Sequence, residues 1–188
     1  MCGCNGCNRC SICPEEVEVI NTFEDPVVTE TSQPRAAVAG RNYFLTTQRQ
    51  SVANNASLFL QITNPVGSGR ILHIGRIAGT SNSNLVITFN RNGSFALAGT
   101  SITPVNSNFA STNTSIATAK FVNQVADPTV GGVIFEDIVQ LATGGVVAVE
   151  YEGDIVMPPG TTFVIRTLNN SGGNNVISID FSFWETTH

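Results

Sequence analysis

The sequence predicts an all-β fold, a jelly-roll-type antiparallel β-sandwich with an extended N-terminal arm. Two observations predict the sandwich. Short runs of alternating, β-branched or aromatic residues recur along the chain, and Gly, Asn or Pro bounds each run. No window of ten or more residues has a convincing helical period. Eight to ten short strands in one body indicate two packed sheets, for which a jelly roll is the expected form.

The predicted strands begin after residue 42 and continue almost to the end of the chain. They are Tyr43–Thr47, Ser57–Thr63, Ile71–Ala78, Leu85–Asn90, Ser94–Leu97, Ala117–Val125, Val133–Leu141, Val146–Tyr151, Thr162–Leu168 and Val176–Trp184. The last strand has the clearest pattern. Apolar residues occupy every odd position from Ile177 to Phe183, and polar residues lie between them. Because side chains alternate across a strand, this pattern predicts one core face and one wet face.

Turn residues separate these runs. Asn92-Gly93 predicts a hairpin between the fourth and fifth strands, because a type I′ turn needs positive φ at both central positions. Met157–Gly160 (Met-Pro-Pro-Gly) predicts a rigid corner, and Asn169–Asn175 predicts a polar tip between the last two strands. Ile102–Ser115 is predicted to be a polar surface loop.

Composition divides the chain into three regions. Residues 1–13 form a tip of Cys, Gly and Asn, residues 14–41 form an acidic connector arm, and residues 42–188 form the β-sandwich domain. The connector holds six of the fourteen acidic residues. All five cysteines lie in the tip, and none lies in the predicted sandwich.

The placement of the cysteines predicts intermolecular disulfides. They are Cys2, Cys4, Cys7, Cys10 and Cys13. Disulfides that stabilise a small core are spread through that core, whereas these are confined to an arm. An odd number of thiols also cannot pair completely within one chain, which favours a partner outside it.

Two other interpretations of the tip remain open. Cys4, Cys7, Cys10 and Cys13 have a C-x₂-C-x₂-C-x₂-C spacing, which is close to zinc and iron–sulfur ligand runs. A metal site usually folds its surroundings, and a short Gly/Asn tip offers little to fold. The other alternative is a reactive or regulatory thiol cluster. We therefore expect no cofactor, with the four-cysteine metal site as the alternative.

The connector arm has a strand-like segment. Val17 and Val19 alternate with glutamates, and Ile20 and Phe23 follow. This pattern predicts that the arm adds a strand to the open edge of a neighbouring subunit. The alternatives are an acidic spacer that pairs with nothing and an arm that folds back on its own body.

Several partners and activities are not expected. Net charge is -5 and the nine basic residues are scattered singly, which argues against a nucleic-acid surface. No apolar run approaches the roughly 20 residues that span a bilayer, so no membrane association is expected. The N-terminus lacks the charged and then apolar pattern of a secretory signal.

Catalysis is also not expected. The only histidines are His73 and His188, and the body has no cysteine nucleophile. Two carboxylate pairs, Glu136/Asp137 and Glu150/Glu152, are the remaining candidates, although adjacent strand carboxylates are more often solvated surface. Glycan binding through Asn-rich loops and Trp184 remains an alternative.

The layout of a Cys-rich N-terminal connector before a Cys-poor jelly roll resembles the subunits of bacterial endospore appendages, the Ena-type fibres. The resemblance implies synthesis without a signal peptide and a helical or stacked homo-polymer formed by sheet augmentation. It also implies that connectors bind the neighbouring turn through disulfides, and the five tip cysteines match the connector cysteines as a group. Because this body supplies no acceptor cysteine, the bonds would join tip to tip or tip to another spore-surface anchor protein.

The function expected from the sequence is that of a structural subunit. It would self-assemble into an extracellular or spore-surface fibre by β-sheet augmentation, and disulfides from the arm would lock the polymer. The alternative is an anchored binding module, such as a glycan-binding or virion decoration β-sandwich.

Overall fold

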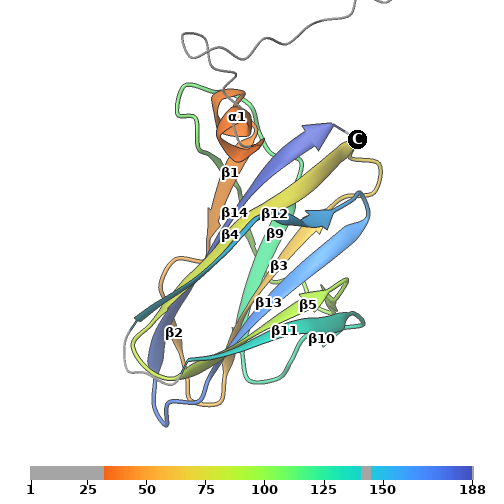
Figure 1. Cartoon of the computed structure of the whole chain (residues 1–188). Coiled ribbons are helices and arrows are strands. Elements are labelled where there is room, and N and C mark those ends of the chain that lie inside the picture. Colours follow the sequence, from red (N-terminus) through yellow and green to blue (C-terminus); the bar gives the residue numbers. More distant parts are fainter. Residues whose placement is uncertain (1–31, 141–144, 188) are drawn as a thin grey trace, which may run out of the picture. The chain divides into compact units, whose positions relative to one another are not determined.

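The computed structural model describes residues 32–140 and 145–187, and these residues form an antiparallel β-sandwich with one short helix (Figure 1). This confirms the all-β sandwich predicted from the sequence. The elements are α1 (Ser32–Val38), β1 (Asn42–Thr46), β2 (Gln50–Val52), β3 (Ser57–Asn64), β4 (Arg70–Ser81), β5 (Leu85–Arg91), β6 (Ser94–Phe95), β7 (Thr100–Ile102), β8 (Val105–Asn106), β9 (Thr118–Gln124), β10 (Thr129–Val130), β11 (Val133–Gln140), β12 (Gly145–Met157), β13 (Thr161–Asn169) and β14 (Asn175–Thr187).

The strand order is that of a jelly roll. The first sheet, called sheet A, has the order β12-β4-β14-β1-β8, with β2 paired to the end of β14. The second, called sheet B, has the order β11-β5-β13-β3-β9-β7. The eight principal strands are therefore β1-β14-β4-β12 in one sheet and β3-β13-β5-β11 in the other. This order gives the two Greek keys of the jelly roll, and β6 to β10 form an insertion between β5 and β11.

The hydrophobic core fills the space between the sheets. The odd residues of β14 from Ile177 to Phe183 are buried, as the alternation predicts. The predicted wet face is wrong, because Ser178, Ser182 and Trp184 are buried as well, and α1 and Gly153 pack against this strand. Aromatic rings continue from one to the next through the core, with centroid separations of 5.9 Å for Phe89–Phe163, 6.1 Å for Phe163–Phe181 and 5.8 Å for Phe181–Phe183. Each buried Phe contributes about 1.5–3 kcal/mol through the removal of apolar surface from water.

Helix α1 lies at the end of the segment that the sequence assigned to the connector, and it packs against β1 and β14. Pro34 fits its first turn, where a backbone N–H would lack an intrahelical acceptor. The helix ends in a Schellman motif: Gly40 N–H donates to the Ala37 carbonyl, Arg41 N–H donates to the Ala36 carbonyl, and Gly40 has a φ of +63°.

The polar loop predicted at Ile102–Ser115 holds the end of α1 in place, because its asparagines donate hydrogen bonds there. The Asn108 side-chain amide donates to the Val38 carbonyl at 3.1 Å, and the Asn106 amide donates to the Gly40 carbonyl at 2.9 Å. The Asn113 amide also donates to the Gly40 carbonyl, at 3.2 Å. These bonds satisfy carbonyls at the helix end that have no intrahelical partner.

The predicted hairpin at Asn92-Gly93 is wrong. β5 pairs with β11 and β13, whereas β6 pairs with β10. Asn92 has a φ of +59°, but the chain then crosses the outer face of sheet B instead of turning back. There Phe95 packs with Phe59 and Val164 in a second, small apolar cluster, and its N–H donates to the Gln61 side chain at 2.6 Å.

The two predicted connections after residue 156 are confirmed. The Met157–Gly160 corner joins β12 to β13 with Gly160 at a φ of +82°, and the Asn169–Asn175 tip joins β13 to β14. In the described ranges, no helix has the length and apolar character needed to cross a membrane.

Candidate functional site: the open edge of the sandwich

The two sides of the sandwich differ in how their sheets end. On one side the terminal strands are β11, with 8 residues, and β12, with 13 residues. Among the described strands, β11 pairs with β5 alone and β12 pairs with β4 alone. On the other side the terminal strands are short, with 2 residues in β8 and 3 in β7. We call β11 and β12 together the open edge.

The open edge presents apolar side chains to solvent. Six large apolar residues are exposed there, namely Val133, Ile134, Phe135, Val139, Val146 and Val156. Val146, on the outer face of sheet A, is 65% exposed. A long edge strand with unpaired backbone groups and exposed apolar side chains is a template for pairing with another chain.

An excursion divides the ladder of β12. Glu150 pairs with Arg76, and the next paired residue, Ile155, faces Ile74, so the residues between them leave the ladder. Within this excursion Glu152 and Gly153 have φ values of +48° and +96°. The straight part of the edge is therefore Gly145–Glu150, because a bulge redirects the backbone and ends regular pairing.

The excursion rests on Trp184 of β14. A Cβ built on Gly153 would lie 2.5 Å from the indole, so only a glycine permits this approach. The His73 ring is stacked with the same indole, with centroids 5.2 Å apart and planes inclined by 11°. Burial lowers the pKa of His73, and its Nε2 lies 3.0 Å from Thr186 Oγ1. His73 is thus part of the support of the excursion.

A hydrogen bond links the two strands of the open edge. Tyr151 Oη donates to Glu136 Oε2 at 2.5 Å, which joins β12 of sheet A to β11 of sheet B. Burial, followed by the Glu136 carboxylate, raises the pKa of Tyr151. The Tyr151 ring also meets Phe89 edge to face, with centroids 6.3 Å apart. The two edge strands are consequently held together as one surface.

The carboxylates considered as catalytic pairs lie on the open edge. Glu136 accepts from Tyr151, whereas its neighbour Asp137 accepts from Thr88 Oγ1 at 2.6 Å. Glu150 lies on the outer face of sheet A, with its Oε1 at 3.0 Å from Nε of Arg76. Glu136 and Asp137 therefore have different partners rather than one shared site, and Glu150 pairs with a basic residue. Within the described ranges, no three His, Cys, Asp or Glu side chains gather as metal ligands.

Trp184, the residue considered for glycan stacking, is only 2% exposed. Its Nε1 is buried and has no hydrogen-bond partner among the described residues. Because His73 and Gly153 cover it, the indole offers no free face to a sugar ring. His188 lies outside the described residues.

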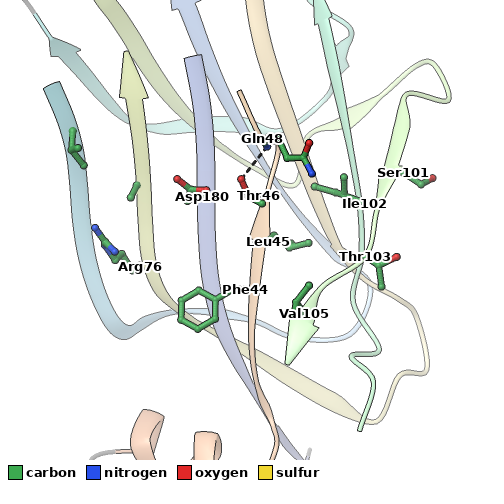
Figure 2. Close-up of a pocket in the computed structure, with 12 residues that line it drawn as sticks. Phe44, Leu45, Thr46, Gln48, Arg76, Ser101, Ile102, Thr103, Val105 and Asp180 are labelled. Carbon is green, nitrogen blue, oxygen red and sulfur yellow. Dashed lines mark hydrogen bonds between the residues drawn. The ribbon is translucent and has the colours of Figure 1, made fainter. Parts of the chain in front are cut away.

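A wide pocket of about 710 Å³ lies beside β1 (Figure 2). Figure 2 shows Phe44 and Asp180 on one side of this strand and Ile102 and Val105 on the other. A second pocket, of about 580 Å³, opens near the excursion, and Phe135 and Asp154 are among its lining residues. Both pockets are open to solvent and have mixed polar and apolar walls.

The tip and the strand-like segment of the arm lie outside the described residues. These residues are Cys2, Cys4, Cys7, Cys10, Cys13, Val17, Val19, Ile20 and Phe23. Their disulfide, metal-binding and strand-addition roles therefore stay predictions.

The sequence alone does not indicate the open edge as a site. Both of its strands are predicted from the sequence. Their position at an edge is not, because it depends on which other strands pair with them, and the residues of one strand do not determine that. Comparison of the chain with protein-family models, with curated proteins and with solved structures found no match.

Proposed function

We propose that this chain is a structural subunit of a self-assembling extracellular or spore-surface fibre, in which the sandwiches join by β-sheet augmentation. The observation that carries the proposal is the open edge, where two long strands end their sheets on the same side. An added strand would satisfy the unpaired N–H and C=O groups and cover the exposed apolar side chains.

The segment proposed for this pairing is Gly145–Glu150 of β12. It is regular, it precedes the excursion, and Tyr151 ties it to β11. The excursion then acts as a stop, because its backbone does not continue the ladder. A stop of this kind favours one register over others, since a slip of one residue would reverse the faces of the added strand.

The tip cysteines supply the second part of the proposal. All five thiols lie within the first thirteen residues, ahead of a body that has none. Intermolecular disulfides from this segment would lock neighbouring subunits, and each typically adds about 2–4 kcal/mol. The resemblance to endospore appendage subunits supports the spore-surface location.

Electron microscopy of the purified full-length chain, with and without reductant, tests the assembly. We expect regular filaments. Val146→Lys places a charge on the open edge and should leave folded single subunits, because an edge lysine opposes strand pairing. Val66→Lys is the matched control, since Val66 is 89% exposed in the loop between β3 and β4. Filaments of Val146→Lys that match the wild type would contradict the proposal.

Replacing all five cysteines by serine tests the disulfides. The filaments should still form. They should dissociate at a lower temperature or a lower denaturant concentration than wild-type filaments. Equal resistance, or only single chains on non-reducing gels of native material, would exclude a locking role for the tip.

The alternative is an anchored binding module, and the pocket beside β1 is the observation that favours it (Figure 2). Two results together would support this alternative over the fibre. The images would show discrete monomers or trimers, and the protein would bind a glycan saturably, with this binding lost in Phe44→Ala.

A further inference from the structure

The second pocket, of about 580 Å³, is bounded by residues of both sheets, beside the corner that joins β12 to β13. We call this pocket the mouth. Its volume lies in the range of sites that hold small molecules. β5, β11, β12 and β13 all contribute to its walls, which include Arg91, Phe135, Asp154, Ile155, Met157 and Phe163. The mouth therefore opens into the space between the sheets.

The inner wall of the mouth is apolar. Met157 and Phe163 belong to the main core, and Ile155 packs against it. Phe135 adds a ring that remains 44% exposed, although its centroid lies only 5.6 Å from that of Phe163. An aromatic ring that is partly open beside the core offers apolar surface to a ligand that enters the mouth.

Arg91 brings a positive charge to this apolar wall. The alternate residues before it in β5, Ile87 and Phe89, are buried, so the alternation of the strand places Arg91 on the same inward face. Inward positions of a sandwich are normally apolar, and an arginine at the end of such a row is an exception. The ion pairs of the described residues involve Arg76 and Arg166, and Arg91 takes part in neither.

Asp154 brings a negative charge to the same pocket. It follows Gly153 in the excursion, where the backbone has left the ladder of β12. Within the described ranges Asp154 has no ion-pair partner, so Arg91 does not neutralise it. An aspartate and an arginine that line one pocket without pairing leave acceptors and donors for a ligand that carries both charges.

We propose that the mouth binds a free amino acid with an apolar side chain. The ligand carboxylate pairs with Arg91, because a guanidinium matches a carboxylate in geometry as well as in charge. The ligand ammonium pairs with Asp154, and the ligand side chain covers the Phe135 ring. A ligand with only one of the two charges leaves the other residue without its partner, which weakens binding. This binding activity goes beyond the proposed assembly and does not depend on it.

Calorimetric titration of the full-length chain in reductant tests the class of ligand. We expect L-leucine to bind with a dissociation constant on the order of 1 mM, a value within reach of a ligand of this size. N-Acetyl-L-leucine lacks the ammonium, L-leucinamide lacks the carboxylate, and glycine lacks the apolar side chain. Each analogue should bind about tenfold more weakly or worse. The titrations are repeated on Val146→Lys, so that no neighbouring copy covers the mouth.

Substitutions of the two charged residues test the site. Arg91→Gln and Asp154→Asn should each weaken L-leucine binding about tenfold, because each removes one charge-assisted pair. Arg91→Gln should also lose the preference for L-leucine over L-leucinamide, and Asp154→Asn the preference over N-acetyl-L-leucine. Glu152→Gln is the matched control, since Glu152 lies in the same excursion but does not line the mouth, and it should bind like the wild type. Melting temperatures show whether each variant retains the fold.

Trp184 gives a second signal for binding. The excursion rests on its indole at Gly153, the residue before Asp154, so L-leucine should change the tryptophan emission with the midpoint found by calorimetry. Absence of L-leucine binding in both backgrounds at about 20 mM, well above the expected dissociation constant, would overturn the proposal. Equal binding of L-leucine, L-leucinamide and N-acetyl-L-leucine would also overturn it, as would wild-type affinity in both Arg91→Gln and Asp154→Asn.

Discussion

At the scale of single residues, Gly40 fixes how α1 meets the sandwich. Its φ of +63° closes the helix, and a Cβ at this position would lie 2.2 Å from Ser111 Oγ. We expect Gly40→Ala to lower the free energy of unfolding by more than about 2 kcal/mol, because backbone strain and a steric clash add. Denaturant unfolding measures this loss.

Gly67→Ala is the matched control for that substitution. Gly67 has a φ of +72°, but no atom lies within 4 Å of the Cβ that alanine would add. Gly67→Ala should lower the free energy of unfolding by about 1 kcal/mol, because the backbone conformation alone disfavours alanine. If the two substitutions lower the free energy of unfolding equally, the contact between the helix end and the asparagine loop does not contribute to stability.

Tyr151 should make the stability of the fold depend on pH in the alkaline range. Its pKa is raised in the folded protein, mainly by burial and then by Glu136, so the folded state favours the neutral phenol. This stabilisation is complete below the unfolded tyrosine pKa of about 10 and is lost as pH rises above it. The free energy of unfolding should therefore fall above about pH 10.

Tyr151→Phe identifies the contribution of this residue. The variant should lose about 1–2 kcal/mol at neutral pH, because Glu136 loses its donor, and its stability should fall less steeply above pH 10. Burial also raises the pKa of Tyr43, so some alkaline dependence should persist. Melting temperatures of both proteins between pH 7 and about 12 measure the difference, and parallel curves would contradict it.

At the scale of elements, the sequence predicts strands well and their partners poorly. The alternation in β14 predicts its core face correctly, but it does not predict that Ser178, Ser182 and Trp184 on the other face are buried too. For β12 the prediction ended at Tyr151, whereas the strand continues to Met157. The Glu-Gly-Asp sequence inside it resembles the end of a strand, but the structure makes it an excursion. The paired positions resume beyond it at Ile155.

The candidate site was harder to predict than the strands. Val133–Leu141 and Val146–Tyr151 are rich in apolar residues, which is also typical of strands in the centre of a sheet. Their position at the open edge follows from strand order, which depends on the whole topology. The acidic residues in these strands were the available signal, because charged residues are common devices on natural sheet edges.

A substitution at Gly153 tests the contact between the excursion and Trp184. Gly153→Ala adds a methyl group against the Trp184 indole, at a position with a φ of +96°. We expect a loss of about 1–3 kcal/mol and a red-shifted tryptophan fluorescence, because the excursion must move away and admit water. Trp184 is the single tryptophan of the chain, so its emission reports on this contact alone. Gly172→Ala has a φ of +86° and open space around it, and its emission should match the wild type.

At the scale of the whole molecule, hydrogen exchange should map the assembly directly. In the separate subunit, amides of β13 and β14 should exchange slowly, because strands flank them on both sides, whereas the outer amides of β11 and β12 should exchange rapidly. Assembly through the open edge should add protection at Gly145–Glu150, where the added strand would pair. Unchanged exchange at the open edge on assembly would show that the subunits join through another surface, because an added strand must protect the amides that it binds.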